Sequence, residues 1–194
     1  MRLILASASP RRAELLRAAG IPFDVSAVEI DERFHPDESP EKSVARLATS
    51  KAVAVAASQN GAIVLGADTT VVVGDEALGK PANTADAARM LRLLSGRTHE
   101  VLTGICVCAK DRTVVHVERT LVRVAQLTEQ DIAWYIGTGE PADKAGAYAI
   151  QGLGSRFIEG IDGSYSNVVG LPISSVYRAL KDLGCDILGS TKTL

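Results

Sequence analysis

The stretch from Ile63 to Val73, which reads Ile-Val-Leu-Gly-Ala-Asp-Thr-Thr-Val-Val-Val, constrains this chain more than any other part of it. Runs of β-branched residues flank a single acid, Asp68, so the stretch predicts a buried β-strand that carries one carboxylate. An unpaired charge inside a core is strongly unfavourable. Two interpretations follow: a polar pocket where basic residues or a metal ion balance Asp68, or a β-bulge where Asp68 caps the neighbouring backbone. The basic residues elsewhere in the chain favour the pocket.

Composition limits the kinds of protein that this chain can be. Its 194 residues, 46% of them hydrophobic, suffice for a single domain over residues 1–194, and two small lobes around a cleft also fit this length. The 21 basic and 23 acidic residues give a net charge of −2. Such a chain has no overall basic field to hold a phosphate backbone, which argues against polymeric nucleic acid as a partner.

The cysteines and the apolar runs indicate where the protein works. Cys106, Cys108 and Cys185 are odd in number and form no C-x-x-C pair, which argues against a disulfide framework and against a zinc site. We therefore expect reduced core thiols in a cytoplasmic protein. No apolar run reaches the ~18 residues that a membrane span needs, and the N-terminus lacks the apolar region of a signal peptide. No membrane association is expected.

Local signals predict an alternation of strands and helices. Ser9 and Pro10 open a helix that Gly20 ends, and Ser39 and Pro40 open a second helix that runs to about Ser58. Further helices are expected from Thr84 to Leu94, with Thr84 as the cap, from Thr128 to Gly137, and from Pro172 to Leu183. Strands are expected from Leu3 to Ala6 and from Phe23 to Ile30, and a long β-hairpin from Arg97 to Ala109 and from Thr113 to Val124.

The turn between the first strand and the first helix has the chemistry of a phosphate site. Ser7-Ala8-Ser9-Pro10-Arg11-Arg12 combines hydroxyls and guanidinium groups with the backbone N–H groups of a helix N-terminus, and this combination suits a polyphosphate. It is not a Walker A loop, because the glycines and the Lys-Ser/Thr pair are absent. The alternative is an ordinary capped helix with solvated arginines.

Three further positions suggest ligands, each with a simpler alternative. Asp31 and Glu32 are paired acids that suit a hard cation such as magnesium, although acids at a strand end are often only solvated. Lys51 lies among apolar neighbours on its helix, where it either extends to water or turns toward a phosphate. The loop Gly79-Lys80-Pro81 leaves Lys80 able to reach inward. His99 is interpreted as a structural histidine rather than a catalytic one.

The segment from Gly139 to Gly152 mixes charges, small residues and an amide, which is not the composition of a core. Small residues let a flat ligand approach the backbone, and the Gln151 amide both donates and accepts hydrogen bonds, as a base edge requires. The alternative is a tight loop and a short helix packed under the sheet.

Taken together, five short motifs resemble the Maf family of nucleoside triphosphate pyrophosphatases. They are Ser7 to Arg12, Gly66 to Thr69, Gly79 to Pro81, Gly96 to His99, and Asp143 to Gly152, in order over nearly the whole chain. Each is weak alone, but five in sequence are specific. The last motif is similar to the dTTP/UTP branch of the family, although Ala149 stands where that branch usually has glycine.

The resemblance implies an α/β fold similar to inosine triphosphatases, with an elongated, curved mixed β-sheet flanked by helices and a central substrate cleft. It implies hydrolysis between the α and β phosphates of dTTP or UTP, a divalent cation (Mg or Mn), and a homodimer. By position, Asp68 would accept a proton from water and help ligate the metal together with Glu32. The nucleotide would be read by Arg11, Thr69 and Gln151, and the phosphates would be held by Ser7, Arg12, Lys51 and Lys80.

Two other classes of protein are alternatives to this enzyme. A non-catalytic nucleotide-binding regulator is suggested by the family's association with septum formation during cell division, but a polyanion binder gains nothing from Asp68. A small kinase or phosphatase is disfavoured, because the phosphate loop and a nucleophile paired with a base are both missing.

Overall fold

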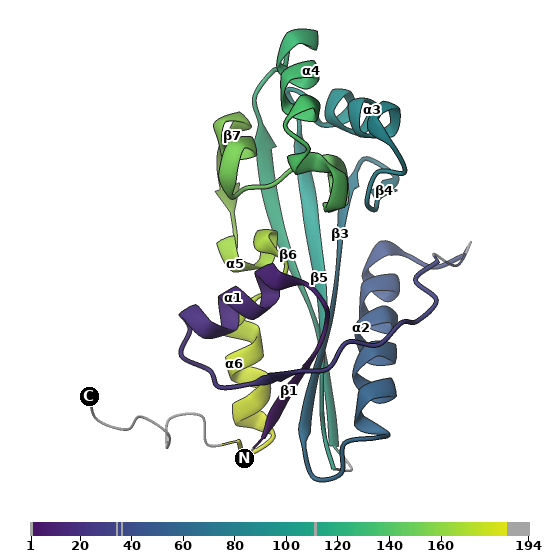
Figure 1. Ribbon diagram of the computed structural model, residues 1–194, viewed down its shortest axis with the longest axis vertical. Coiled ribbons are helices and arrows are strands. Elements are labelled where there is room, and N and C mark those ends of the chain that lie inside the picture. The colour runs from purple at the N-terminus through teal and green to yellow at the C-terminus, as the bar shows by residue number, and fades with distance from the viewer. Residues whose placement is uncertain (1, 34, 36, 111, 186–194) are drawn as a thin grey trace. The chain divides into compact units, whose positions relative to one another are not determined.

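The computed structural model describes residues 2–33, 35, 37–110 and 112–185, and Figure 1 shows the order of its elements. The helices are α1 (Pro10–Ala18), α2 (Pro40–Ala56), α3 (Thr84–Leu94), α4 (Glu129–Gly137), α5 (Tyr165–Val169) and α6 (Ile173–Asp182), and short 3₁₀ helices are η1 (Glu140–Asp143), η2 (Ala145–Ala147) and η3 (Gly152–Phe157). The strands are β1 (Leu3–Ala6), β2 (Asp24–Val25), β3 (Ile63–Val73), β4 (Glu76–Leu78), β5 (Thr98–Ala109), β6 (Arg112–Val124) and β7 (Ile158–Asp162).

The strands form one mixed sheet in the order β2-β1-β3-β5-β6-β7, with β4 paired to β3. Strand β1 pairs in parallel with both β2 and β3. Strand β4 is antiparallel to β3, and β7 is antiparallel to β6. The predicted mixed sheet flanked by helices is therefore confirmed, whereas the central substrate cleft stays a prediction.

The chain divides into two compact units, each with its own core. The first unit comprises residues 1–68, 103–118 and 170–194, and the second comprises residues 69–102 and 119–169. Strand β3 passes from the first unit into the second between Asp68 and Thr69.

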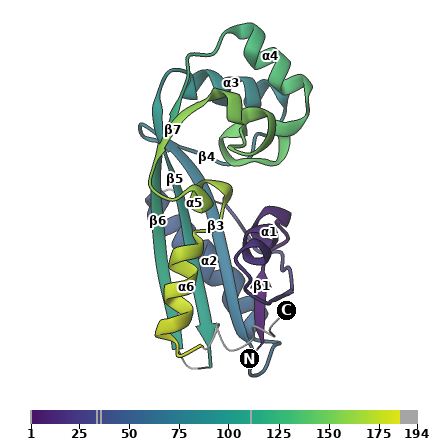
Figure 2. The ribbon, with the colours of Figure 1, turned by 90° about the vertical axis from the view of Figure 1, so that its left-hand side faces the viewer.

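In the first unit, alternation along the strands creates two apolar layers. Leu3 and Leu5 belong to the cluster formed with α1 and α6, whereas Ile4 and Ala6 belong to the cluster formed with α2. Successive side chains of a strand point to opposite faces of the sheet, so α2 and α6 cover opposite faces, as Figure 2 shows. The same alternation in β3 turns the even-numbered positions toward α2, and Asp68 is one of these positions.

Two glycines let α2 approach the sheet closely. A Cβ atom placed on Gly66 would lie 2.1 Å from the carbonyl oxygen of Ala48, and one placed on Gly104 would lie 2.3 Å from that of Val44. Real Cβ atoms do not approach backbone oxygens this closely, so a larger residue would push α2 outward. Gly66 thereby sets the distance between α2 and β3 just before Asp68.

In the second unit, α3 and α4 pack with the strand ends and the 3₁₀ segments around one apolar cluster. Helix α4 begins with a capping box, in which the Thr128 side chain accepts from the backbone of Asp131 and the Asp131 side chain accepts from the backbone of Thr128. Tyr135 of α4 is fully buried and packs edge-on against Phe157, with 5.5 Å between the ring centroids.

Most elements confirm the predictions from sequence, and the exceptions have physical reasons. The predicted strand from Phe23 to Ile30 is wrong, because only Asp24 and Val25 pair with β1 and both are exposed. The cap of α3 is Asn83, whose side chain accepts from the N–H of Asp86, rather than Thr84. The final helix begins one residue after Pro172, which is its N-cap.

Candidate active site

Asp68 lies at the centre of a charge cluster in the first unit. The Lys51 ammonium from α2 donates to Asp68 Oδ1 at 2.7 Å, and Glu32 Oε1 lies 2.6 Å from the same nitrogen atom. The side chains of Lys51 and Asp68 are only 10% and 15% exposed. The cluster exists because Asp68 falls on the α2 face of β3, where the approach of α2 at Gly66 places Lys51 opposite it. Thus Asp68 is paired with a cation, as the pocket interpretation requires, instead of capping nearby backbone.

The two neighbouring acids predicted as a pair have different partners. Asp31 forms an ion pair with Arg33 at 2.6 Å, and hydrogen bonds from the side chain and backbone of Arg33 lower the pKa of Asp31 to about 2. Glu32 instead reaches Lys51, although more than half of its side chain is exposed. Only Glu32 of the two is therefore placed to act together with Asp68.

Arg12 fixes the backbone next to this cluster. Its guanidinium donates to the carbonyl oxygen of Ala67 at 2.8 Å, to that of Gly170 at 2.9 Å and to the hydroxyl of Ser7 at 3.0 Å. Burial lowers the pKa of Arg12, and the nearby charges of Asp68 and Glu32 oppose that effect. A buried arginine bonded to the carbonyl before Asp68 holds the start of α1 against β3.

The other predicted residues of the N-terminal turn surround Arg12. Ser7 is buried, and its hydroxyl accepts from Arg12 and from the backbone N–H of Ser9 at 3.3 Å. Ser9 is the N-cap of α1 and Pro10 is its first residue, as predicted. Arg11 is half-buried in the first turn of that helix. The structure thus gathers Ser7, Arg11 and Arg12 at one helix start, and their contacts with phosphate stay predictions.

The donor set of the cluster fits a hard divalent cation. Glu32 and Asp68 each direct a carboxylate oxygen at one positive charge, that of Lys51. Mg²⁺ is usually held by one or two carboxylates together with substrate phosphates rather than by a cage of protein ligands. The described residues contain no group of three or more His, Cys, Asp or Glu side chains that would hold a metal by themselves, and the metal stays a prediction.

The remaining predicted residues belong to the second unit. Thr69 follows Asp68 directly in β3 and is half-buried, and Lys80 is exposed in the loop after β4. Gln151 is half-buried in extended backbone just before η3, with φ −90° and ψ 153°. Their roles stay predictions.

His99 has the environment of a structural histidine. It is 2% exposed, its Nε2 lies 2.8 Å from the hydroxyl of Tyr148, and the two rings pack edge-on. Burial lowers the pKa of His99 to about 4, so the ring is neutral at neutral pH. This geometry agrees with the structural role predicted for His99.

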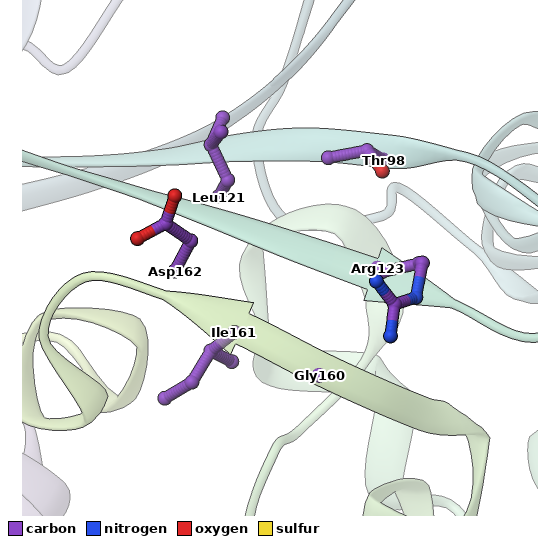
Figure 3. Close-up of a pocket in the computed structure, with 6 residues that line it drawn as sticks. All are labelled: Thr98, Leu121, Arg123, Gly160, Ile161 and Asp162. Carbon is purple, nitrogen blue, oxygen red and sulfur yellow. The ribbon is translucent and has the colours of Figure 1, made fainter.

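A separate hollow of about 310 Å³ lies on the second unit, as Figure 3 shows. It is lined by Thr98, Leu121, Arg123, Gly160, Ile161 and Asp162. Arg123 is paired with Glu159 at 3.0 Å, and Asp162 places an acid in the same wall. A lining of mixed charge, with no predicted site residue in it, does not suit a triphosphate.

Comparison with known proteins identifies the family of this chain. The family model described as "Maf-like protein" matches residues 2–183. The chain is 54% identical over 184 residues to a protein of Koribacter versatilis named dTTP/UTP pyrophosphatase, with 95% of each chain covered. It is 52% identical over 186 residues to a Bacillus cereus protein of the same name, with 96% of this chain and 97% of that protein covered. The chain therefore belongs to the Maf-like protein family.

A solved structure shows the same fold at low sequence identity. The Staphylococcus aureus Ham1 protein superposes with a TM-score of 0.52 and 14% identity, over 94% of this chain and 100% of that one. At that identity the similarity concerns the fold alone. Across the described part of the chain, no helix combines the length and the apolar character needed to cross a bilayer.

Proposed function

We propose that this protein hydrolyses dTTP and UTP to the nucleoside monophosphate and pyrophosphate. The observation that carries the proposal is the Asp68–Lys51–Glu32 cluster, a nearly buried carboxylate held by a lysine beside a helix start with two arginines. Relatives with more than half of their residues in common are named dTTP/UTP pyrophosphatase, which supports the choice of substrate.

In this proposal Asp68 is the general base. Lys51 engages Oδ1 of Asp68, which fixes the orientation of the carboxylate and leaves its other oxygen to accept a proton from water. The water oxygen bonds to one phosphorus of the α–β anhydride, the bridging P–O bond breaks, and its electron pair leaves with the departing phosphate group. The proton passes to Asp68 and then to solvent. No covalent intermediate with the protein is needed.

Charge on the phosphates is balanced by the basic side chains. Arg11 lies beside Arg12 in the first turn of α1, and Arg12 fixes the local backbone. Lys51 supplies positive charge next to the general base, Asp68. Glu32 and Asp68 would hold a Mg²⁺ or Mn²⁺ ion, which when bound neutralises charge on phosphate oxygens. We propose that Lys80 also contacts phosphates, and that Arg11, Thr69 and Gln151 read the nucleotide.

We further propose that the protein is a cytoplasmic homodimer. The resemblance to the family supports the dimer, and the buried thiols of Cys106, Cys108 and Cys185, which are not in disulfides, support a reducing compartment. Sedimentation equilibrium checks the dimer, and a monomer at micromolar concentration contradicts it.

Steady-state kinetics test which nucleobase the enzyme prefers. The Gln151 amide can donate to a carbonyl and accept from the ring N–H of uracil or thymine, whereas cytosine reverses part of that pattern. A mismatched buried amide costs about 1–3 kcal/mol, so we expect kcat/KM for dTTP and UTP to exceed that for CTP by roughly 5- to 150-fold. Gln151→Ala should reduce that ratio. A wild type that prefers GTP or ATP, or a variant with an unaltered ranking, would remove Gln151 from this role.

A further inference from the structure

Two residues, Tyr135 and Glu140, hold the backbone on both sides of Gln151. The hydroxyl of buried Tyr135 accepts from the backbone N–H of Ala149 at 3.0 Å and donates to Glu140 Oε1 at 2.8 Å. The carboxylate of Glu140 also accepts from the backbone N–H groups of Leu153 and Gly154, each at 2.9 Å. One connected set of hydrogen bonds therefore fixes the backbone before and after Gln151.

Two glycines let the carboxylate of Glu140 and the hydroxyl of Tyr135 approach the backbone of this segment closely. Gly152 has φ +75°, and a Cβ atom on it would lie 2.5 Å from Glu140 Oε2. A Cβ atom on Gly154 would lie 2.5 Å from the hydroxyl oxygen of Tyr135. Glycine is favoured at position 152 by its positive φ, and at position 154 by the backbone oxygen of Ala149, which would lie 2.5 Å from an added Cβ atom.

The protonation states of Glu140 and Tyr135 keep these hydrogen bonds intact at neutral pH. Burial alone would raise the pKa of Glu140, but the hydrogen bonds from Leu153, Gly154 and Tyr135 outweigh it, so the pKa is lowered. Burial and the neighbouring Glu140 raise the pKa of Tyr135. Glu140 therefore stays an ionised acceptor, and Tyr135 stays a protonated donor. The Lys144 ammonium donates to the carbonyl oxygen of Glu140 at 2.7 Å and secures the backbone of that residue.

The side chain of Gln151 takes no part in this network. None of the described residues hydrogen-bonds to its amide, whereas the backbone on both sides is fixed. No protein hydrogen bond therefore holds the amide, and the place from which Gln151 reaches a ligand is set by the fixed backbone on its two sides.

We propose that Tyr135 and Glu140 are positioning residues that fix the backbone from which the Gln151 amide reaches the nucleobase and thereby determine base selectivity. This inference rests on the proposed function, in which Gln151 reads a pyrimidine base. A fixed backbone limits the positions from which the amide can reach the edge of the base. A loosened backbone lets the amide reach other positions, including ones that suit cytosine, so selectivity falls more than rate does.

The test compares Tyr135→Phe and Glu140→Gln with wild type on dTTP and CTP. Tyr135→Phe keeps the ring packing but removes both bonds of the hydroxyl, and Glu140→Gln puts an NH₂ group where a backbone N–H needs an acceptor. We expect the ratio of kcat/KM for dTTP over kcat/KM for CTP to fall about tenfold in each variant, mainly through a higher kcat/KM for CTP. Matched controls are Tyr165→Phe and Glu159→Gln, which alter exposed residues of the same unit.

Two further measurements separate positioning from simple destabilisation. If the two residues act as one unit, the double variant should lose no more selectivity than either single variant. The ratio of the dissociation constants for dTTP and CTP, measured on the Asp68→Asn background, reports base selectivity even where turnover fails. Wild type that binds dTTP preferentially without hydrolysing it would refute the proposed function alone.

An unchanged dTTP/CTP ratio in folded Tyr135→Phe protein, or equal losses on both nucleotides, would overturn the inference. Thermal unfolding shows whether each variant is folded. If Glu140→Gln does not fold, Tyr135→Phe alone decides, because it deletes one oxygen atom and leaves the carboxylate in place. If wild-type protein binds dTTP and CTP with equal affinity, both this inference and the proposed recognition of the nucleobase by Gln151 are wrong.

Discussion

Asp68→Asn protein should turn over dTTP about 10²-fold or more slowly than wild type, while it still folds and still binds the nucleotide. Asparagine has the shape of aspartate, and its carbonyl oxygen still accepts from Lys51, so the cluster keeps its packing. It has no basic oxygen, however, to take a proton from water. The loss should therefore appear in kcat rather than in KM.

The matched control is Asp75→Asn, which changes an exposed acid in the turn after β3 and should leave turnover unchanged. Excess chelator should abolish wild-type activity, because we propose that Glu32 and Asp68 hold a divalent ion. Near-normal turnover of Asp68→Asn, or full activity with chelator present, would remove Asp68 and the metal from the reaction. A variant that folds and binds but does not turn over would also argue against a purely nucleotide-binding regulator as the reason for this carboxylate.

Lys51→Met should lower both stability and activity. Methionine fills much of the same space on α2 but leaves the nearly buried Asp68 without its cation. Removing one partner of a buried ion pair destabilises by about 3 kcal/mol, and most of this loss comes from the unpaired carboxylate that remains. Activity should fall as well, because the orientation of Asp68 is lost. Urea unfolding at neutral pH and steady-state kinetics measure the two effects.

The exposed Lys42 on the same helix provides the control for charge alone, and Lys42→Met should change the free energy of unfolding by no more than about 0.5 kcal/mol. The double variant Lys51→Met/Asp68→Asn should regain part of the stability that Lys51→Met loses, since no unpaired charge is left. Equal effects of Lys51→Met and Lys42→Met would show that the cluster does not form in solution.

Local signals in the sequence were enough to predict several elements. The Ser-Pro pairs at the starts of α1 and α2 and the capping sequence of α4 act within one turn, so they can be recognised without knowledge of the fold. The long β5–β6 hairpin is also local. Strand β2 could not be delimited, because its two residues are fixed by pairing with Ile4 and Leu5 of β1 rather than by their own pattern.

The residues of the Asp68–Lys51–Glu32 cluster could be named as candidates from the sequence, but their contacts could not be predicted. Asp68 was recognisable as the lone acid in an apolar strand, but its pairing with Lys51 depends on the face of β3 that meets α2. The bonds from Arg12 to Ala67 and Gly170 join parts of the chain that only the folded sheet brings together. Only the structure therefore showed that Arg12 is a buried anchor.

The sequence gives only a weak indication of the Tyr135–Glu140 pair. Both residues precede the segment from Gly146 to Gly154, whose glycines indicate a close approach of some other group, but nothing in the sequence identifies that group. The hydrogen bond from the N–H of Ala149 to the buried hydroxyl of Tyr135 is visible only in the folded unit.

Identification of the products that wild-type protein releases from dTTP in the presence of magnesium tests the proposed reaction most directly. Separation of the nucleotides by anion-exchange chromatography, together with a pyrophosphate-specific assay, distinguishes cleavage of the two anhydride bonds. Cleavage between the α and β phosphates predicts dTMP and pyrophosphate in equal amounts, at a rate that Asp68→Asn reduces about 10²-fold. Release of dTDP and inorganic phosphate, or no hydrolysis of dTTP and UTP under conditions in which the protein is folded, would contradict it.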